Sequence, residues 1–522
     1  GLFLSQELFD ETVLENESVF ELSRQEALDE TLSQYSNYSL LHLVRSHPST
    51  DIEERLERQE FKRAVEMIKS EDKEELLQAL TTIRECCTSN PHAHLILLQH
   101  YQAMPALVSL FQKNDLSSAT KVLQESIETL VVILTPNNNN NKPSRQVQSE
   151  LRDCMAPCWD HWTTLFTSAS TTMQSLLLQL AFVSCKFNEE NKQQWLRSST
   201  TRATNKNGIV VLMKILQQEE ENVLVKIQAC RLISTIGKFD DFRTPSTNTS
   251  LPTTSCAHEA AMAFYKHNAV PILYTIVHEC MNETTTADNT SITLLETSLS
   301  ALRVLAIQHD IVESMVEVGV LDLIPTILVE YSKSLTILAA TLGLIRNMCA
   351  HDVVKTQVCR PNGILQTILT AMQQYPQHEQ IQQHACASMA QMALRHPHNS
   401  RFIVENVHGH VLIIQAMKHH TQNAVIQRQG ALAIRNLASR CPKGGAIHHA
   451  LLNAGAEPVL REAGKHQSSV DEAYAALKEL NCSVKVYKVD EQGKTVERTT
   501  MFGEAKLNFR PVLEESSWNT MD

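Results

Sequence analysis

Four basic residues recur along the second half of the chain at nearly constant spacing. They are Arg303, Arg346, Arg435 and Lys478, and Ala390 occupies the equivalent place between the second and the third. The successive steps are 43, 44, 45 and 43 residues. Because a guanidinium group can donate two parallel hydrogen bonds to a carboxylate or a phosphate, this series could bind an acidic or phosphorylated partner. The alternative is that these side chains are solvated and pair with neighbouring glutamates.

The elements that carry these residues are predicted to be repeating helices. Each basic residue directly follows the first of two apolar residues that lie three apart in a helical pattern. A period in the low forties is typical of stacked helical repeats, which bury their apolar faces against one another. Nine such anchor pairs are present: Leu80/Ile83, Ile127/Leu130, Leu180/Val183, Ile233/Ile236, Leu302/Leu305, Ile345/Met348, Met389/Met392, Ile434/Leu437 and Leu477/Leu480.

Upstream of Leu302 the repeat is less regular. Going back from this residue, the steps between anchors are 69, 53, 53 and 47 residues. The additional residues fall in segments rich in Asn, Ser and Thr, which are too polar to bury a core. We therefore predict loops inserted near residues 136–148, 197–207, 240–256 and 282–291.

One repeat is predicted to contain three helices, as residues 397–438 illustrate. A short helix begins at Pro397, His408–Gly409 interrupts the chain, and two further helices cover 410–419 and 424–438. Glycine tolerates the positive φ that ends a helix. The same interruption is expected at Gly319, Gly363 and Gly455.

The net charge of −12 is concentrated at one end of the chain. Residues 1–60 contain 14 acidic and 4 basic side chains, so the rest of the chain is close to neutral. This balance disfavours nonspecific binding of nucleic acid, which needs a strong basic field. Leu8, Phe9, Val13 and Phe20 predict an amphipathic helix in this acidic leader, and one hypothesis is that the leader docks on the basic series.

Targeting and catalytic signals are absent from the sequence. No apolar stretch is long enough to cross a membrane, and no signal peptide precedes Glu7. We therefore expect a cytoplasmic protein, with the nucleus as an additional location, and no membrane partner. The sequence contains no Walker loop, GxSxG or HExxH motif, so we expect no enzyme activity, cofactor or metal.

The cysteine and histidine residues are better explained by structural roles than by catalysis or metal binding. Thirteen cysteines, most of them in helical patterns, indicate a reducing compartment in which Cys serves as a small core residue. Cys185, Cys230, Cys349 and Cys386 are expected to be packed in the core. The histidine pairs, His419–His420 and His448–His449, are expected at solvated helix ends, with a metal site as the less favoured alternative.

These anchors, glycine breaks and helix lengths resemble the armadillo-repeat family over roughly residues 292–481, and more weakly back to about residue 75. The resemblance implies an all-α, right-handed superhelical solenoid of about nine three-helix repeats. It divides the chain into an acidic helical leader at 1–70, the solenoid at 71–482 and a C-terminal tail at 483–522.

The resemblance also implies a binding surface. In armadillo proteins the third helices line a concave groove, where outward Asn side chains hold the backbone of an extended peptide. Asn347 and Asn436 match that position and Gln391 lies at the equivalent place, whereas Gly343 and Leu432 replace the Trp found one turn earlier in import receptors. The predicted partner-binding set is Arg303, Arg346, Asn347, Gln391, Arg435, Asn436 and Lys478.

The sequence therefore favours a non-enzymatic scaffold that binds extended or acidic segments of other proteins in this groove. Two alternatives remain open at this stage. One is a regulatory or assembly subunit of an enzyme complex, and the other is a solenoid that binds nucleic acid through its basic series.

Overall fold

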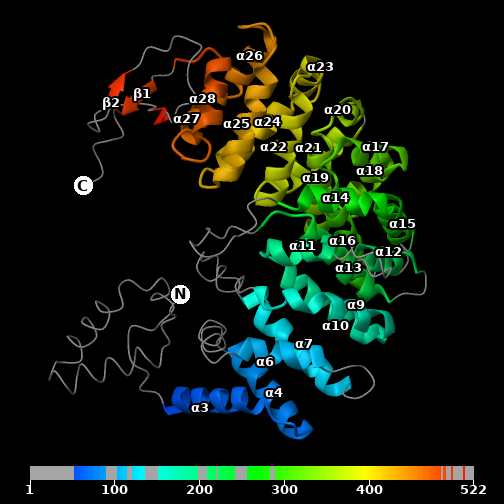
Figure 1. The fold of residues 1–522 in the computed structure, drawn as a ribbon. Coiled ribbons are helices and arrows are strands. Elements are labelled where there is room, and N and C mark those ends of the chain that lie inside the picture. Colours follow the sequence, from blue (N-terminus) through cyan, green and yellow to red (C-terminus); the bar gives the residue numbers. More distant parts are fainter. Residues whose placement is uncertain are drawn as a thin grey trace, which may run out of the picture. The chain divides into compact units, whose positions relative to one another are not determined.

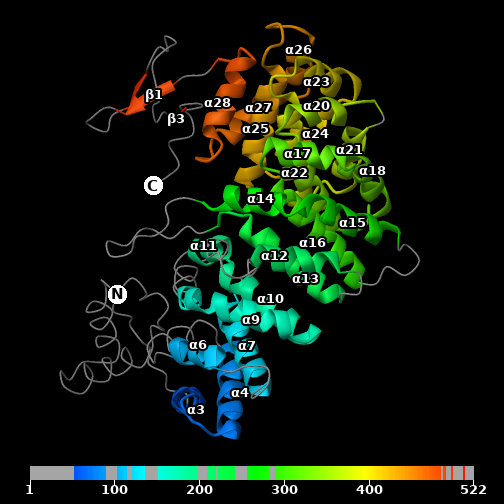
Figure 2. The same cartoon turned by 45° about the vertical axis from the view of Figure 1, so that its right-hand side comes forward.

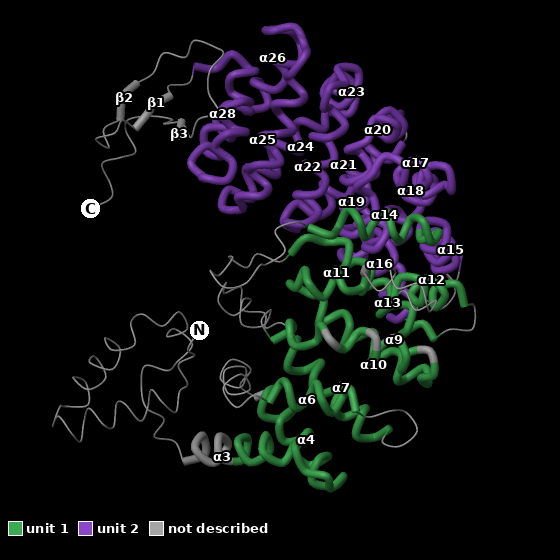
Figure 3. Tube along the Cα trace, viewed as in Figure 1, with its two compact units in different colours: residues 1–269 green, residues 270–522 purple. Residues whose placement is uncertain are grey.

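The computed structural model divides the chain into two units, residues 1–269 and residues 270–522 (Figure 3). The predicted leader helix lies outside the described residues, and the four predicted loop insertions lie mostly outside them. The described residues are 52–89, 103–113, 120–135, 151–197, 208–218, 222–240, 255–282, 289–361, 363–483, 486–489, 495–497 and 510–511.

The described part of unit 1 is helical. Helices α4, α7, α10 and α13 pack against one another in chain order, and α3 packs against α4. The elements are α3 (Ile52–Met67), α4 (Lys73–Ser89), α6 (Ala103–Lys113), α7 (Thr120–Leu134), η2 (Ala156–Cys158), α9 (Trp159–Ser168), α10 (Thr171–Cys185), α11 (Glu189–Arg197), α12 (Gly208–Gln217), α13 (Val223–Ile236) and α14 (Ala257–Lys266).

Unit 2 begins at α15 and repeats a short first helix, a second helix and a long third helix. Figures 1 and 2 show the first helices following one another along one edge of this unit and the third helices along another. The elements are α15 (Ala269–Asn282), α16 (Asn289–Leu305), α17 (His309–Glu317), α18 (Val320–Glu330), α19 (Leu335–Met348), α20 (Asp352–Val358), α21 (Ile364–Gln374), α22 (Glu379–Ala393), α23 (Pro397–Arg401), the π-helix η3 (Phe402–Asn406), α24 (Gly409–His419), α25 (Ala424–Ala438), α26 (Ala446–Asn453), α27 (Ala456–Ala463) and α28 (Val470–Glu479).

The nine predicted anchor pairs form the core. Each pair lies in or at the end of α4, α7, α10, α13, α16, α19, α22, α25 or α28, and every anchor side chain is at most 3% exposed. Within each unit, neighbouring third helices therefore meet through these residues, because a single repeat cannot cover its own apolar face. The predicted solenoid of three-helix repeats and the predicted burial of Cys185, Cys230, Cys349 and Cys386 are confirmed.

The four predicted glycine breaks all occur between helices, but only two of the four glycines have a positive φ. Gly319 and Gly455 precede α18 and α27 with φ of 93° and 91°, in the left-handed region where glycine is favoured. At the break before α24, however, His408 has the positive φ of 53°. Gly409 is instead needed for close packing, because a Cβ there would lie 3.1 Å from Ile403 Cγ2. Gly363 precedes α21 with φ of −96°, so the break occurs at this position without a positive φ.

Polar side chains at the ends of second helices tie successive repeats of unit 2 together. The hydroxyl of Tyr375 donates to the Ser332 carbonyl at 2.7 Å. His420 Nε2 lies 2.9 Å from the Pro376 carbonyl, so this nitrogen must carry the proton. His466 Nε2 makes the same kind of contact, at 2.6 Å, with the carbonyl of Thr421. These bonds link positions one repeat apart.

The histidine pairs are therefore not simply solvated. His420 is 8% exposed, and His448 is 2% exposed with its Nε2 3.1 Å from the Ala438 carbonyl. The prediction of solvated helix ends was wrong for these two residues, because backbone carbonyls that end neighbouring helices need a donor. His419 and His449 are exposed, as predicted.

An aromatic cluster fixes α11 within unit 1. Trp195 on this helix makes edge contacts with Trp159 and Trp162, at ring-centroid distances of 5.5 and 4.8 Å. The indole of Trp162 donates to the Leu177 carbonyl at 2.8 Å. Gly208, at the start of α12, must lack a side chain, since a Cβ there would lie 2.3 Å from the Trp195 ring.

The C-terminal residues contain three short strands. β1 (Val486–Val489) pairs in antiparallel fashion with β2 (Thr495–Glu497) on one side and β3 (Arg510–Pro511) on the other. In the sequence, residues 484–487 alternate between apolar and polar, and this pattern alone predicts a single strand without partners. That prediction was incomplete, because its partners are very short and carry little alternating pattern of their own.

Candidate binding surface of the third helices

The predicted site residues of unit 2 lie on five consecutive third helices. Helices α16, α19, α22, α25 and α28 pack against one another in that order. The residues are Arg303 on α16, Arg346 and Asn347 on α19, Gln391 on α22, Arg435 and Asn436 on α25, and Lys478 on α28. The four basic residues therefore come from four different third helices, and α22 carries Ala390 at the equivalent position.

The two Asn side chains hold neighbouring third helices together. Asn347 Nδ2 donates to the carbonyl of Arg303 at 2.8 Å, and Asn436 Nδ2 donates to the carbonyl of Ala390 at 2.9 Å. In unit 1, Thr129 Oγ1 contacts the Leu80 carbonyl at 3.3 Å in the same way. Asn436 is only 5% exposed. These amides therefore have a structural use between repeats, which the sequence pattern did not indicate.

Arg303 fills the space that glycine leaves on the next helix. A Cβ at Gly343 would lie 2.9 Å from both Cδ and Nη1 of Arg303. The guanidinium therefore rests against the backbone of α19, at the place where import receptors carry a Trp. Arg303 is half-buried as a result.

Arg346 lies close to this guanidinium. It follows Gly343 by three residues on α19, and residues three apart are neighbours on a helix surface. Helical side chains also lean toward the N-terminus, which brings Arg346 toward the turn that holds Gly343. Burial, followed by the charge of Arg346, lowers the pKa of Arg303, and burial lowers the pKa of Arg346 itself.

Neither arginine is neutralised within the described part of the chain. No carboxylate there forms an ion pair with Arg303 or Arg346, although ion pairs occur on other third helices. In unit 1, for example, Arg84 pairs with Glu128 on α7, and in unit 2 Arg428 on α25 pairs with Glu472 at 2.8 Å. Two half-buried positive charges therefore lie side by side without a counter-charge.

His384 on α22 completes this cluster, and the sequence pattern missed it. Its side chain is 7% exposed, and its Nδ1 is buried without a hydrogen-bond partner among the described residues. Burial, followed by the charges of Arg303 and Arg346, lowers its pKa to about 3. The repeat spacing here is 44 residues, so His384 on α22 is the equivalent of Ala340 on α19. Ala340 lies about one helical turn before Gly343. The only sequence signal was a His within an apolar helix face.

The remaining predicted residues are more accessible. Arg435 and Lys478 are exposed and Gln391 is half-buried. Within the described residues, Arg435 forms no ion pair. The basic series is therefore divided into a half-buried pair on α16 and α19 and two exposed cations on α25 and α28.

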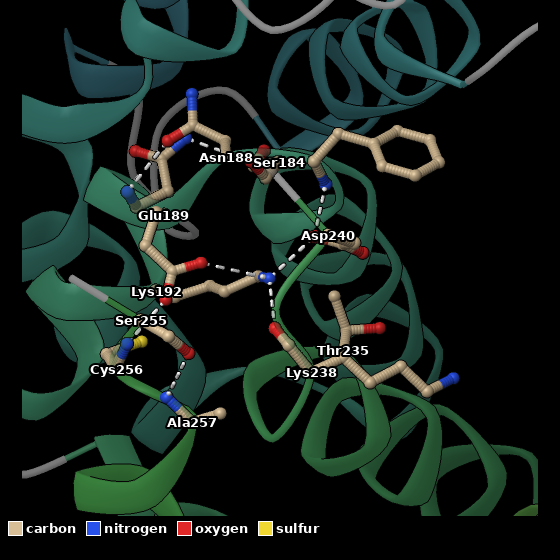
Figure 4. Close-up of polar contacts among 12 residues, drawn as sticks. Ser184, Asn188, Glu189, Lys192, Thr235, Lys238, Asp240, Ser255, Cys256 and Ala257 are labelled. Atoms are coloured by element: carbon tan, nitrogen blue, oxygen red, sulfur yellow. Dashed lines mark hydrogen bonds and ion pairs between the residues drawn. The ribbon is translucent and has the colours of Figure 1, made fainter. Parts of the chain in front are cut away.

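A second buried cluster lies in unit 1 and is built differently (Figure 4). Lys192 on α11 is 0% exposed, and its Nζ lies 2.6 Å from Asp240 Oδ1, 2.6 Å from the Lys238 carbonyl and 3.4 Å from Glu189 Oε2. Glu189 Oε1 also accepts the backbone N–H of Cys256 at 2.6 Å. The charge is thus neutralised by two carboxylates.

This cluster holds two chain segments at α11. Burial alone would lower the pKa of Lys192, but the charges of Asp240 and Glu189 outweigh it and raise that pKa. Asp240 and Cys256 come from the two sides of residues 241–254. We interpret the cluster as structural, because every charge in it has a partner.

Other reactive groups in the described residues are inert or isolated. Burial raises the pKa of the Cys386 thiol to about 12, so this thiol stays protonated and is a poor nucleophile. No group of three or more metal-ligating side chains occurs in the described ranges. Among the described helices, none is long and apolar enough to cross a membrane.

The three-helix repeat, the buried anchors and the ties between third helices together define an armadillo-type solenoid. Residues 250–443 match the family model of the LRRK2 ARM repeat. Residues 3–58 match the model of the armadillo repeat-containing protein 6 N-terminal domain. The chain is therefore an armadillo-type solenoid, and over these two ranges it is similar to armadillo-repeat proteins.

The sequence resembles armadillo repeat-containing protein 6 at two places, one near the N-terminus and one near the C-terminus. The N-terminal one, around Gln6–Asp10 and Glu15–Asn16, is confirmed by the match over residues 3–58. The C-terminal one, around Ala454–Glu457 and Leu460–Ala463, stays a prediction.

Among solved structures, one similar chain comes from work on a phosphorylation switch that controls the interaction between cadherin and beta-catenin. It is 14% identical, with 91% of this chain and 96% of that chain covered and a TM-score of 0.42. A likeness of that size carries no functional argument. A comparison with curated proteins found no match.

Proposed function

We propose that this protein is a non-enzymatic scaffold whose third helices bind an extended, acidic segment of another protein. The armadillo-repeat fold supports a scaffold role in general, because such solenoids expose long continuous surfaces. The surface consists of α16, α19, α22, α25 and α28, and its basic residues are Arg303, Arg346, Arg435 and Lys478. The segment would lie in a concave groove along these helices.

The observation that carries this proposal is that Arg303, Arg346 and Arg435 have no carboxylate partner among the described residues. Arg303 and Arg346 are half-buried without a carboxylate among the described residues, and Arg435 is exposed without one. A buried cation costs folding free energy unless it is paired, so proteins rarely keep one without a use. An acidic partner would supply the missing counter-charge on successive repeats.

The proposal assigns roles to the three parts of the chain. Residues 71–482 form the binding solenoid, residues 1–70 are an acidic leader, and residues 483–522 are a C-terminal tail. We place the protein in the cytoplasm, with the nucleus as an additional location. Asn347 and Asn436 contribute by fixing the third helices, and Gln391 is left as the amide of the series that can contact a partner backbone.

Charge reversal of three arginines tests the proposal. The variant R303E/R346E/R435E should lose the proteins captured by the wild-type chain in proximity labelling and in pull-downs from the same cells. We expect the loss to be nearly complete, because truncating or reversing a charge at an interface commonly changes affinity by a factor of tens or more.

The matched control is K333E/R401E/K443E, which changes the net charge equally at three exposed positions outside the series. Its interaction profile should equal that of the wild-type chain. Circular dichroism should show the same helicity for both variants. Captured proteins that remain unchanged in R303E/R346E/R435E would refute the surface.

A further inference from the structure

Arg303, Arg346 and His384 are set apart from the rest of the basic series by their burial. Arg303 and Arg346 are half-buried and His384 is 7% exposed, whereas Arg435 and Lys478 are exposed. The three residues come from three consecutive third helices, α16, α19 and α22. They therefore form a local cluster and not only a part of a long row.

The positions of the side chains bring their donors together. The guanidinium of Arg303 rests on Gly343, with Nη1 2.9 Å from where a Cβ would be. Arg346 follows Gly343 by three residues on the same helix. His384 lies on α22, which packs against α19, and it is close enough to both arginines for their charges to lower its pKa. Helix α16 also packs against α19.

The charge of the cluster decides which anion fits. The two arginines contribute two positive charges, and burial keeps His384 neutral, so that it can offer one N–H donor without a further charge. A carboxylate carries one negative charge and would leave one arginine uncompensated. A phosphate monoester carries about −1.5 to −2 charges and three acceptor oxygens, which matches two guanidinium groups and one imidazole.

We propose that Arg303, Arg346 and His384 form a subsite for a phosphoryl group, so that the partner segment carries a phosphorylated side chain at this point. The assignment of a partner segment rests on the proposed function, but the oxyanion subsite does not. Arg303 and Arg346 donate charge-assisted hydrogen bonds to the phosphoryl oxygens, and His384 contributes its N–H. Arg435 and Lys478 contact other acidic groups of the segment.

The first test uses inorganic phosphate with the full-length chain. Its effect on the thermal unfolding midpoint is compared with that of acetate at equal ionic strength, since a ligand that binds the folded state raises this midpoint. We expect phosphate to raise the midpoint and acetate not to. R303Q and R346Q should each bind phosphate about tenfold or more weakly, because each removes a hydrogen bond to a charged group.

The matched control is R435Q, which removes an exposed arginine of the same series. It should retain the phosphate response in full. Without phosphate, all three variants should show the helicity and the unfolding midpoint of the wild-type chain to within a few degrees. If acetate stabilises the chain as much as phosphate does, or if R435Q loses the response as R303Q does, the subsite is refuted.

The second test separates the possible sources of the phosphoryl group. Fluorescence polarisation compares three degenerate peptide pools that differ only at a central residue, which is phosphoserine, serine or glutamate. We expect the phosphoserine pool to bind at least tenfold more tightly than either of the others, and this preference to vanish in R303Q and R346Q.

The outcomes distinguish the two proposals. Equal binding of the phosphoserine and glutamate pools would overturn the phosphoryl subsite and leave the acidic scaffold in place. A response to inorganic phosphate without binding of any pool would support the subsite but point to a small phosphate ester as its ligand, and it would overturn the peptide-binding function.

Discussion

Two buried clusters of positive charge, one in each unit, differ in how their charge is balanced. In unit 1, Lys192 contacts two carboxylates and a carbonyl, and Glu189 in turn accepts the N–H of Cys256. In unit 2, Arg303 and Arg346 adjoin His384 with no carboxylate among the described residues. Among the described residues, the first cluster has all its charges paired, whereas the second has no carboxylate partner.

The difference separates a structural network from a binding site. A buried ion that is fully paired stabilises the fold only modestly, but removing one partner is costly because the others stay buried without it. An unpaired pair of cations has the opposite property, since each repels the other and removing one relieves that repulsion. Stability measurements can therefore classify the two clusters without knowledge of any partner.

The largest expected effect is that of K192M in unit 1. This change leaves Glu189 and Asp240 without their cation, so we expect the free energy of unfolding to fall by about 3–5 kcal/mol. Urea unfolding followed by tryptophan fluorescence measures it well, since Trp159, Trp162 and Trp195 lie in this unit around α11.

The matched control is K355M. Lys355 also lies at the start of a first helix, and its Nζ contacts Asp352 Oδ1 at 2.7 Å, but the Asp352 side chain is 76% exposed and stays hydrated without it. We expect a loss of about 1 kcal/mol, typical of one hydrogen bond. Equal losses in K192M and K355M would contradict the special status of the Lys192 cluster.

The contrast between the clusters shows what the sequence could predict. The anchors and the third helices follow from a periodic pattern, and the structure places both as expected. The pattern predicts α25 at its observed bounds, Ala424–Ala438, because polar Asn423 and apolar residues at helical spacing are local signals. The fold class could therefore be predicted, because the same local signals recur in every repeat.

The composition of each cluster could not be predicted in this way. Lys192 and Asp240 are 48 residues apart and belong to different elements, and nothing in the sequence marks them as a pair. His384 looked like one of many helix residues. Asn347 and Asn436 looked like groove residues, although both are hydrogen-bonded to the preceding repeat. Contacts between repeats depend on side-chain direction, which periodicity alone does not specify.

The pH dependence of stability tests the second cluster through His384. Its pKa is about 3 in the folded chain and about 6.5 when unfolded, so below pH 6.5 the unfolded state binds a proton that the folded state does not. Stability is thus lost as the pH falls from 6.5 toward 3, by about 1.4 kcal/mol per unit. Between pH 7.5 and 5.5 the wild-type chain should lose about 1.4 kcal/mol more than H384Q.

Urea unfolding followed by circular dichroism at the two pH values gives this difference. The control is H419Q, which removes an exposed histidine at the end of α24 and should have the wild-type pH dependence. Equal slopes for the wild-type chain and H384Q would mean that burial and the charges of Arg303 and Arg346 do not hold His384 neutral.

The smallest expected effect is that of R346Q, and its sign is what matters. Removing this charge ends the repulsion with Arg303 and exposes no unpaired carboxylate in the described part of the chain, so the free energy of unfolding should stay unchanged or rise by about 0.5 kcal/mol. Urea unfolding of the chain without phosphate measures it. A fall of about 2 kcal/mol or more would show that Arg346 is an ordinary structural residue, and the two clusters would then not differ in kind. With phosphate present, the wild-type chain should become more stable than R346Q, because only the wild-type chain then gains the free energy of phosphate binding.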